Sequence, residues 1–76
     1  MAQAPEYFAG FTKEDPGFVV AVSGFRAMFI NRKGEWTRDP DGAKYALQGG
    51  PEGPRLPPER AEEVVRGWGG EWPVPL

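Results

Sequence analysis

The sequence of this 76-residue chain predicts an α+β fold, in which a small antiparallel β-meander of three to five strands is packed by one C-terminal α-helix. Residues 7–37 are rich in aromatic and β-branched side chains and are divided by short turns, which is typical of hairpin-connected strands. Residues 57–68 instead have apolar side chains at helical spacing. The short links leave no room for the crossovers that parallel strands need, so the order should be antiparallel.

The apolar runs and the turns between them place four strands, at residues 7–12, 18–22, 25–30 and 35–37. The run Phe-Val-Val-Ala-Val at 18–22 is apolar at every position, which favours a central strand covered on both faces. Gly10 in the first strand allows a bulge or a close backbone contact. Turn chemistry separates the strands at residues 13–17, 23–24 and 31–34.

Residues 43–47 have no decisive period. Tyr45 and Leu47 alternate as they would in a strand, whereas Ala43, Ala46 and Leu47 would also suit a turn of helix. We interpret the segment as a further strand. Residues 48–56 are dominated by glycine and proline, so we expect a loop that separates the meander from the helix.

The predicted helix at residues 57–68 has agreeing start, period and stop signals. Its apolar stripe consists of Ala61, Val64, Val65 and Trp68. Prolines and glutamates occupy its first turns, and two glycines follow its end. The tail at 71–76 should run extended and fold back over the sheet, with docking onto a partner as the alternative.

The expected core combines side chains of the strands with those of the helix stripe. At this length a core contributes only about 3–5 kcal/mol beyond the ordering cost, so each large apolar side chain matters. The residues expected in the core are Phe8 or Phe11, Phe18, Val20, Val22, Phe29, Val64, Val65 and Trp68.

The composition excludes several classes of protein. The chain has no histidine and no cysteine, which removes imidazole-dependent triads, thiolate nucleophiles, disulfides and the commonest zinc ligands. It has no long apolar run and no signal peptide, so we expect a cytoplasmic protein without a membrane partner. A net charge of −2 and a pI near 5.0 are not typical of a general nucleic-acid binder.

Motifs that suggest chemistry have simpler interpretations. Ser23 lies in a turn without a base beside it. Asp39-Pro-Asp-Gly42 resembles the start of a calcium loop, but position 50 is glycine where that loop needs a glutamate. The segment at 49–54 lacks the lysine and hydroxyl of a phosphate loop, and the P-x-x-P at 54–58 is better explained as a helix start than as a polyproline ligand. We therefore expect that the protein is not an enzyme and that it has no catalytic residues, no cofactor and no bound metal.

The leading hypothesis is a non-catalytic module that binds another protein or a second copy of itself. A central strand apolar on both faces, with one helix to cover it, leaves apolar area that a tail or partner must shield. The alternative is a small nucleic-acid-associated or regulatory protein, because residues 23–50 carry a local excess of +2 among aromatics. The predicted interaction surface consists of Arg26, Arg32, Lys33, Trp36, Arg38, Tyr45 and Trp72.

Overall fold

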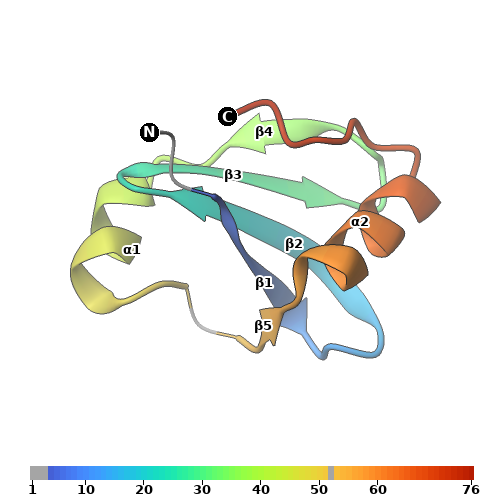
Figure 1. The fold of residues 1–76 in the computed structure, drawn as a ribbon, viewed down its shortest axis with the longest axis horizontal. Helices are drawn as coiled ribbons and strands as arrows, with labels where there is room; N and C mark the ends of the chain where they lie inside the picture. Colours follow the sequence, from blue (N-terminus) through green and yellow to red (C-terminus); the bar gives the residue numbers. More distant parts are fainter. Residues whose placement is uncertain (1–3, 52) are drawn as a thin grey trace.

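The computed structural model describes residues 4–51 and 53–76, and these form one five-stranded antiparallel sheet and two helices. This is the small α+β fold that the sequence predicted. The strand order is β4-β3-β2-β1-β5. Along the chain, the elements are β1 (Glu6–Phe11), β2 (Pro16–Ser23), β3 (Arg26–Asn31), β4 (Trp36–Arg38), α1 (Gly42–Gln48), β5 (Arg55–Leu56) and α2 (Pro58–Gly67) (Figure 1).

The apolar strand β2 lies in the middle of the sheet, between β1 and β3. Its side chains alternate between two separate hydrophobic clusters. Val19 and Ala21 pack on one face, and Val20 and Val22 on the other. Ser23 pairs with Arg26, so the hairpin turn consists of residues 24–25 rather than 23–24 as expected.

Helix α2 and the C-terminal tail cover the first of these faces. Ala61 and Val65 of α2 are buried in the cluster that includes Val19, Ala21 and Ile30. After α2 the chain folds back along the sheet (Figure 1). The Trp72 ring lies 5.2 Å from the Tyr7 ring, and Trp36 Nε1 donates a hydrogen bond to the Glu71 carbonyl at 2.8 Å. The tail therefore completes the cover over this face.

The strand expected at residues 43–47 is wrong, because this segment lies within helix α1. The Asp39 carboxylate accepts a hydrogen bond from the Asp41 backbone N–H at 2.9 Å, which turns the chain just before the helix begins. Gly49, with a φ of 85°, ends the helix. Tyr45 packs against the second face of the sheet, while Leu47 is 87% exposed. The alternation that suggested a strand was therefore not a burial pattern.

The loop expected at residues 48–56 contains the short edge strand β5. Tyr7 pairs with Leu56 and Phe8 with Arg55, and the Ala9 N–H donates to the Pro54 carbonyl at 2.8 Å. The local sequence is rich in strand-breaking residues, so the pairing comes from the free edge of β1. No local period could have predicted it.

The core differs from the expected set mainly in its aromatic residues. Phe8, Val20, Val22 and Val65 are buried as predicted. Phe11, the predicted alternative to Phe8, is 79% exposed. The other expected core residues are only partly buried, namely Phe18, Phe29, Val64 and Trp68. The rest of the core consists of residues outside the expected set, many of them small, namely Tyr7, Ala9, Val19, Ala21, Ala27, Ile30, Leu56 and Ala61. Close packing of helix on sheet favours these smaller groups.

Candidate functional site

The sheet face opposite α2 is only partly covered. Phe8, Val20, Val22 and Ala27 are buried there, and α1 covers one end of the face through Tyr45. From Tyr45 towards the other end of the face extends an open hollow of about 330 Å³. We call the surface around it the aromatic face, which consists of Phe11, Phe18, Val20, Phe29 and Tyr45 together with the rim residues Gly17, Asn31 and Asp39.

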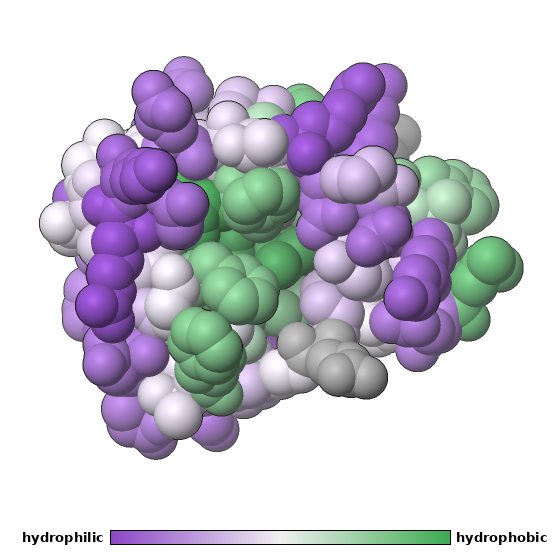
Figure 2. All heavy atoms as spheres, turned by 180° about the vertical axis from the view of Figure 1, so that it is seen from behind, coloured by the Kyte–Doolittle hydropathy of each residue, from purple (hydrophilic) through white to green (hydrophobic). Residues whose placement is uncertain are grey.

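Apolar side chains gather at the centre of this side of the molecule, with hydrophilic side chains around them (Figure 2). Strand alternation explains the gathering, because Phe18 pairs with Asn31 and Val20 with Phe29 on adjacent strands. The rings are therefore held by the rigid sheet rather than by a loop. An exposed apolar patch with a polar rim is typical of a surface that contacts another molecule.

Phe11 is the most unusual residue of the aromatic face. Its backbone has a φ of 74°, the left-handed region that β-carbon sterics disfavour for L-residues other than glycine. Its ring lies edge-on to the Phe18 ring, with centroids 5.8 Å apart and planes at 76°. The side chain is 79% exposed, so this conformation is held for a ring that contributes little to the core.

Two glycines make room for these rings. A β-carbon at Gly10 would lie 2.2 Å from Phe18 Cε1, and one at Gly17 would lie 2.4 Å from Phe11 Cε2. Gly10 also lies in the β-bulge where the register of β1 and β2 shifts, as its position in the sequence predicted. The close approach of both rings to the backbone therefore depends on the absence of side chains at these two positions.

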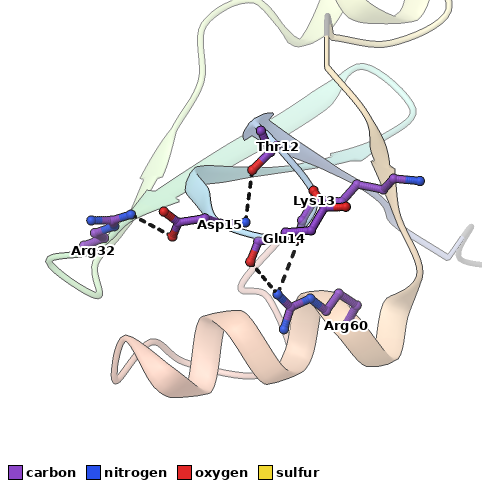
Figure 3. Close-up of polar contacts among 6 residues, drawn as sticks. All are labelled: Thr12, Lys13, Glu14, Asp15, Arg32 and Arg60. Carbon is purple, nitrogen blue, oxygen red and sulfur yellow. Dashed lines mark hydrogen bonds and ion pairs between the residues drawn. The ribbon is translucent and has the colours of Figure 1, made fainter.

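The turn after Phe11 is held from two sides (Figure 3). Arg60 of α2 donates hydrogen bonds to the Glu14 carbonyl at 3.0 Å and to the Lys13 carbonyl at 3.4 Å. Arg32 forms an exposed ion pair with Asp15 at 3.0 Å. The Asp15 N–H also donates to Thr12 Oγ1 at 3.0 Å. These contacts restrict the turn that follows the strained residue.

At the opposite end of the aromatic face, Asp39 binds only neutral donors. Tyr45 Oη donates to Asp39 Oδ2 at 2.9 Å, and the Asp41 N–H donates to Asp39 Oδ1 at the same distance. Burial raises the pKa of Tyr45 to about 12, and the hydrogen bond to Asp39 and the charges of Asp39 and Asp41 add to the effect. Among residues 4–51 and 53–76, Asp39 forms no ion pair, although Arg26 and Arg38 line a neighbouring hollow together with it.

The predicted interaction residues do not form one surface. Tyr45 belongs to the aromatic face, whereas Trp36 and Trp72 pack on the α2 side. Arg26 and Arg38 lie at register positions that alternate with Ala27 and Phe29, and so belong to the α2 side as well. Arg32 and Lys33 are exposed in the β3–β4 turn.

Sequence reasoning missed Phe11, Phe18, Phe29 and Asp39 as site residues, because it assigned the rings to the core and the acid to a turn. Their one available signal was the two-sided apolar pattern of β2. That pattern shows that both faces are apolar, but it does not show which face the helix covers.

Other features of the molecule give weaker indications of a functional site. A larger hollow of about 610 Å³ lies between the tail and the β2–β3 turn, and its lining mixes the polar residues Arg26 and Ser23 with proline and valine. The described residues contain no cluster of acidic side chains that could hold a metal ion. Neither described helix has the length and apolar character that a membrane span requires.

Comparisons with models of known protein families, with curated protein sequences and with solved structures found no match for this chain.

Proposed function

We propose that this chain is a non-catalytic interaction module that binds another protein through the aromatic face. The observation that carries the proposal is Phe11, a highly exposed ring on a left-handed backbone. Backbone strain of this kind costs roughly 1–3 kcal/mol and tends to persist where function requires it. In a chain whose core contributes only about 3–5 kcal/mol, that is a large expense for a solvent-exposed side chain.

The shape of the surface supports a protein partner over a small molecule. The hollow is open rather than enclosed, and the exposed ring of Phe11 packs edge-on against Phe18 in its lining. Protein interfaces concentrate their binding energy in a few aromatic side chains surrounded by polar residues. Phe18 and Phe29 supply such rings here, and Asn31 and Asp39 lie at the rim.

Nucleic acid is less well supported as a partner. Surfaces that stack bases place Arg or Lys beside the exposed rings. Here Arg26 and Arg38 alternate to the other side of the sheet, Arg32 is paired with Asp15, and the rim carries the anionic Asp39. Because no cysteine or disulfide is involved, the cytoplasm is the proposed place of the interaction.

Photo-crosslinking tests the proposal directly. A benzophenone amino acid replaces Phe11 in one version of the chain and Phe25 in another, since Phe25 is a similarly exposed phenylalanine, 73% against 79%, in the β2–β3 turn. In cells that express the chain, irradiation should yield a discrete protein adduct from position 11 and none from position 25. Equal labelling at both positions, or none at position 11, would contradict the proposal. A nuclease-sensitive adduct would instead support the nucleic-acid alternative.

A further inference from the structure

We infer that the partner presents a basic side chain next to apolar residues, and that Asp39 receives this cation at the rim of the aromatic face. The inference rests on the proposed function and specifies the chemistry of the partner. At this end of the hollow, the carboxylate of Asp39 is complementary in charge to a Lys or Arg side chain.

Asp39 differs from Asp15 and Glu6, two other carboxylates that flank the aromatic face. Asp15 is paired with Arg32, and Glu6 is paired with Arg55, whose guanidinium also lies 5.9 Å from the Phe8 ring centroid. Asp39 accepts hydrogen bonds from a phenol and a backbone amide, neither of which neutralises its charge. These donors fix the carboxylate in place while leaving it anionic.

The surroundings of Asp39 suit a long cationic side chain. Val20 and Phe29 line the same hollow, so the methylene groups of a Lys or Arg can lie on apolar surface while the charged group reaches the carboxylate. The rings of Phe29 and Tyr45 add a favourable site for a cation above an aromatic face. Partial removal of water strengthens an ion pair relative to one on an open surface.

The same charge disfavours a second copy of this chain as the occupant. A two-fold dimer buries the same patch from both subunits. Docking through the aromatic face would therefore place two Asp39 carboxylates, and both neighbouring Asp41 carboxylates, in one interface. The net charge of −2 on each chain adds to the repulsion.

Three synthetic peptides test the inference by calorimetry and by amide chemical-shift mapping. The first alternates leucine and lysine, the second replaces each lysine by acetyl-lysine, and the third replaces each leucine by serine. The leucine-lysine peptide should bind and shift the amides around Phe18, Phe29 and Tyr45. Acetylation keeps the side-chain stem but removes its charge, and should weaken binding about tenfold or more, as expected for a charged hydrogen bond. The serine-lysine peptide should not bind measurably.

Two variants of the full chain locate the cation. Asp39→Asn should lower the affinity for the leucine-lysine peptide about tenfold. Glu71→Gln removes one negative charge from the exposed tail and should leave that affinity unchanged. Circular dichroism verifies that both variants are folded. If Asp39→Asn does not fold, the acetyl-lysine comparison on the unmodified chain still decides the question.

Two kinds of failure are distinguishable. Equal binding of the lysine and acetyl-lysine peptides would overturn the basic partner while leaving the aromatic face as a binding surface. Equal binding of the serine-lysine peptide would overturn the inference in a different way, because charge alone would then account for binding without apolar contact. Light scattering that showed a dimer dissociated by Phe29→Ala would also overturn it, in favour of a second copy. Failure of every peptide, together with no adduct from position 11, would overturn the proposed function itself.

Discussion

The two faces of the sheet share the same central strand but differ in what covers them. On the α2 side, small and branched residues such as Ala21 and Ile30 are fully buried beneath the helix and the tail. On the other side, Phe18 and Phe29 are only partly buried and Phe11 is almost bare. One face therefore holds the fold together, and the other presents large rings to solvent. Under the proposed function, this difference assigns stability to one face and binding to the other.

The covering elements explain why the asymmetry is so strong. Helix α2 and the tail both pack on the same side, whereas α1 reaches the other side mainly through Tyr45. Substitutions on the two faces should therefore have very different effects on unfolding, and the following measurements test that contrast.

The largest expected effect is that of Ile30→Ala on the covered face. Ile30 is fully buried between β2, β4 and α2, so truncation should lower the free energy of unfolding by about 3 kcal/mol through lost burial and a cavity. Phe29→Ala, one residue away on the aromatic face, should cost only about 1 kcal/mol, because its ring is already partly in water. Urea denaturation followed by circular dichroism measures both. Equal losses would contradict the contrast between the faces.

A smaller effect is expected from removal of the tail. A chain ending at Gly70 loses the Trp72 ring that packs on Tyr7, which should lower the free energy of unfolding by about 1–2 kcal/mol. It also bares a second apolar face. Light scattering should therefore show association of the shortened chain at concentrations where the full chain is monomeric. Two monomers of equal stability would show that the tail is dispensable.

The end of the aromatic face near α1 should respond to high pH. Folding raises the pKa of Tyr45 to about 12 from the ordinary value of about 10, so the folded state favours the neutral phenol. This contribution is complete below about pH 10 and is lost as the pH rises through about 12. Tyr45→Phe removes the ionisable phenol, so the free energy of unfolding should fall less between about pH 10 and about pH 12. Ultraviolet titration of tyrosinate checks the assignment, and burial also raises the pKa of Tyr7.

The smallest effect on stability should come from Phe11→Gly. Glycine adopts positive φ freely, so relief of about 1 kcal/mol of strain should offset the lost ring contact and the greater freedom of the unfolded chain. We expect a free energy of unfolding within about 0.5 kcal/mol of the unmodified chain, together with loss of binding to the leucine-lysine peptide. A marked loss of stability would show that Phe11 serves the fold instead.

The elements that the sequence predicted are those whose signals are local. The period of residues 57–68 revealed the helix, and the run at 18–22 revealed the central strand. Strand β5 and helix α1 were missed because their causes lie elsewhere in the molecule. The free edge of β1 supplies the partner for residues 55–56, and α1 begins so close to the β2–β3 turn that a β-carbon at Gly42 would lie 2.2 Å from the Phe25 carbonyl oxygen.

The candidate site was predicted only in outline. An apolar central strand with a single helix implied a face in need of a partner, and Tyr45, one of the residues chosen for the interaction surface, lines the hollow on that face. The basic residues and tryptophans chosen with Tyr45 lie elsewhere. Composition shows that aromatic and charged residues are present, but the face on which each side chain lies depends on the strand register, which the sequence does not reveal.

The sequence by itself determined the fold class, the position of β2 at the centre of the sheet and the terminal helix, since each depends on periodicity that neighbouring residues share. Only the tertiary structure decided which face of the sheet α2 and the tail cover, and with it which aromatic rings remain exposed. That choice depends on register and on contacts between residues far apart in the chain, such as Arg60 with the turn at residues 13–14. Burial, and hence the proposed binding surface, is a property of the packed layers rather than of any single segment.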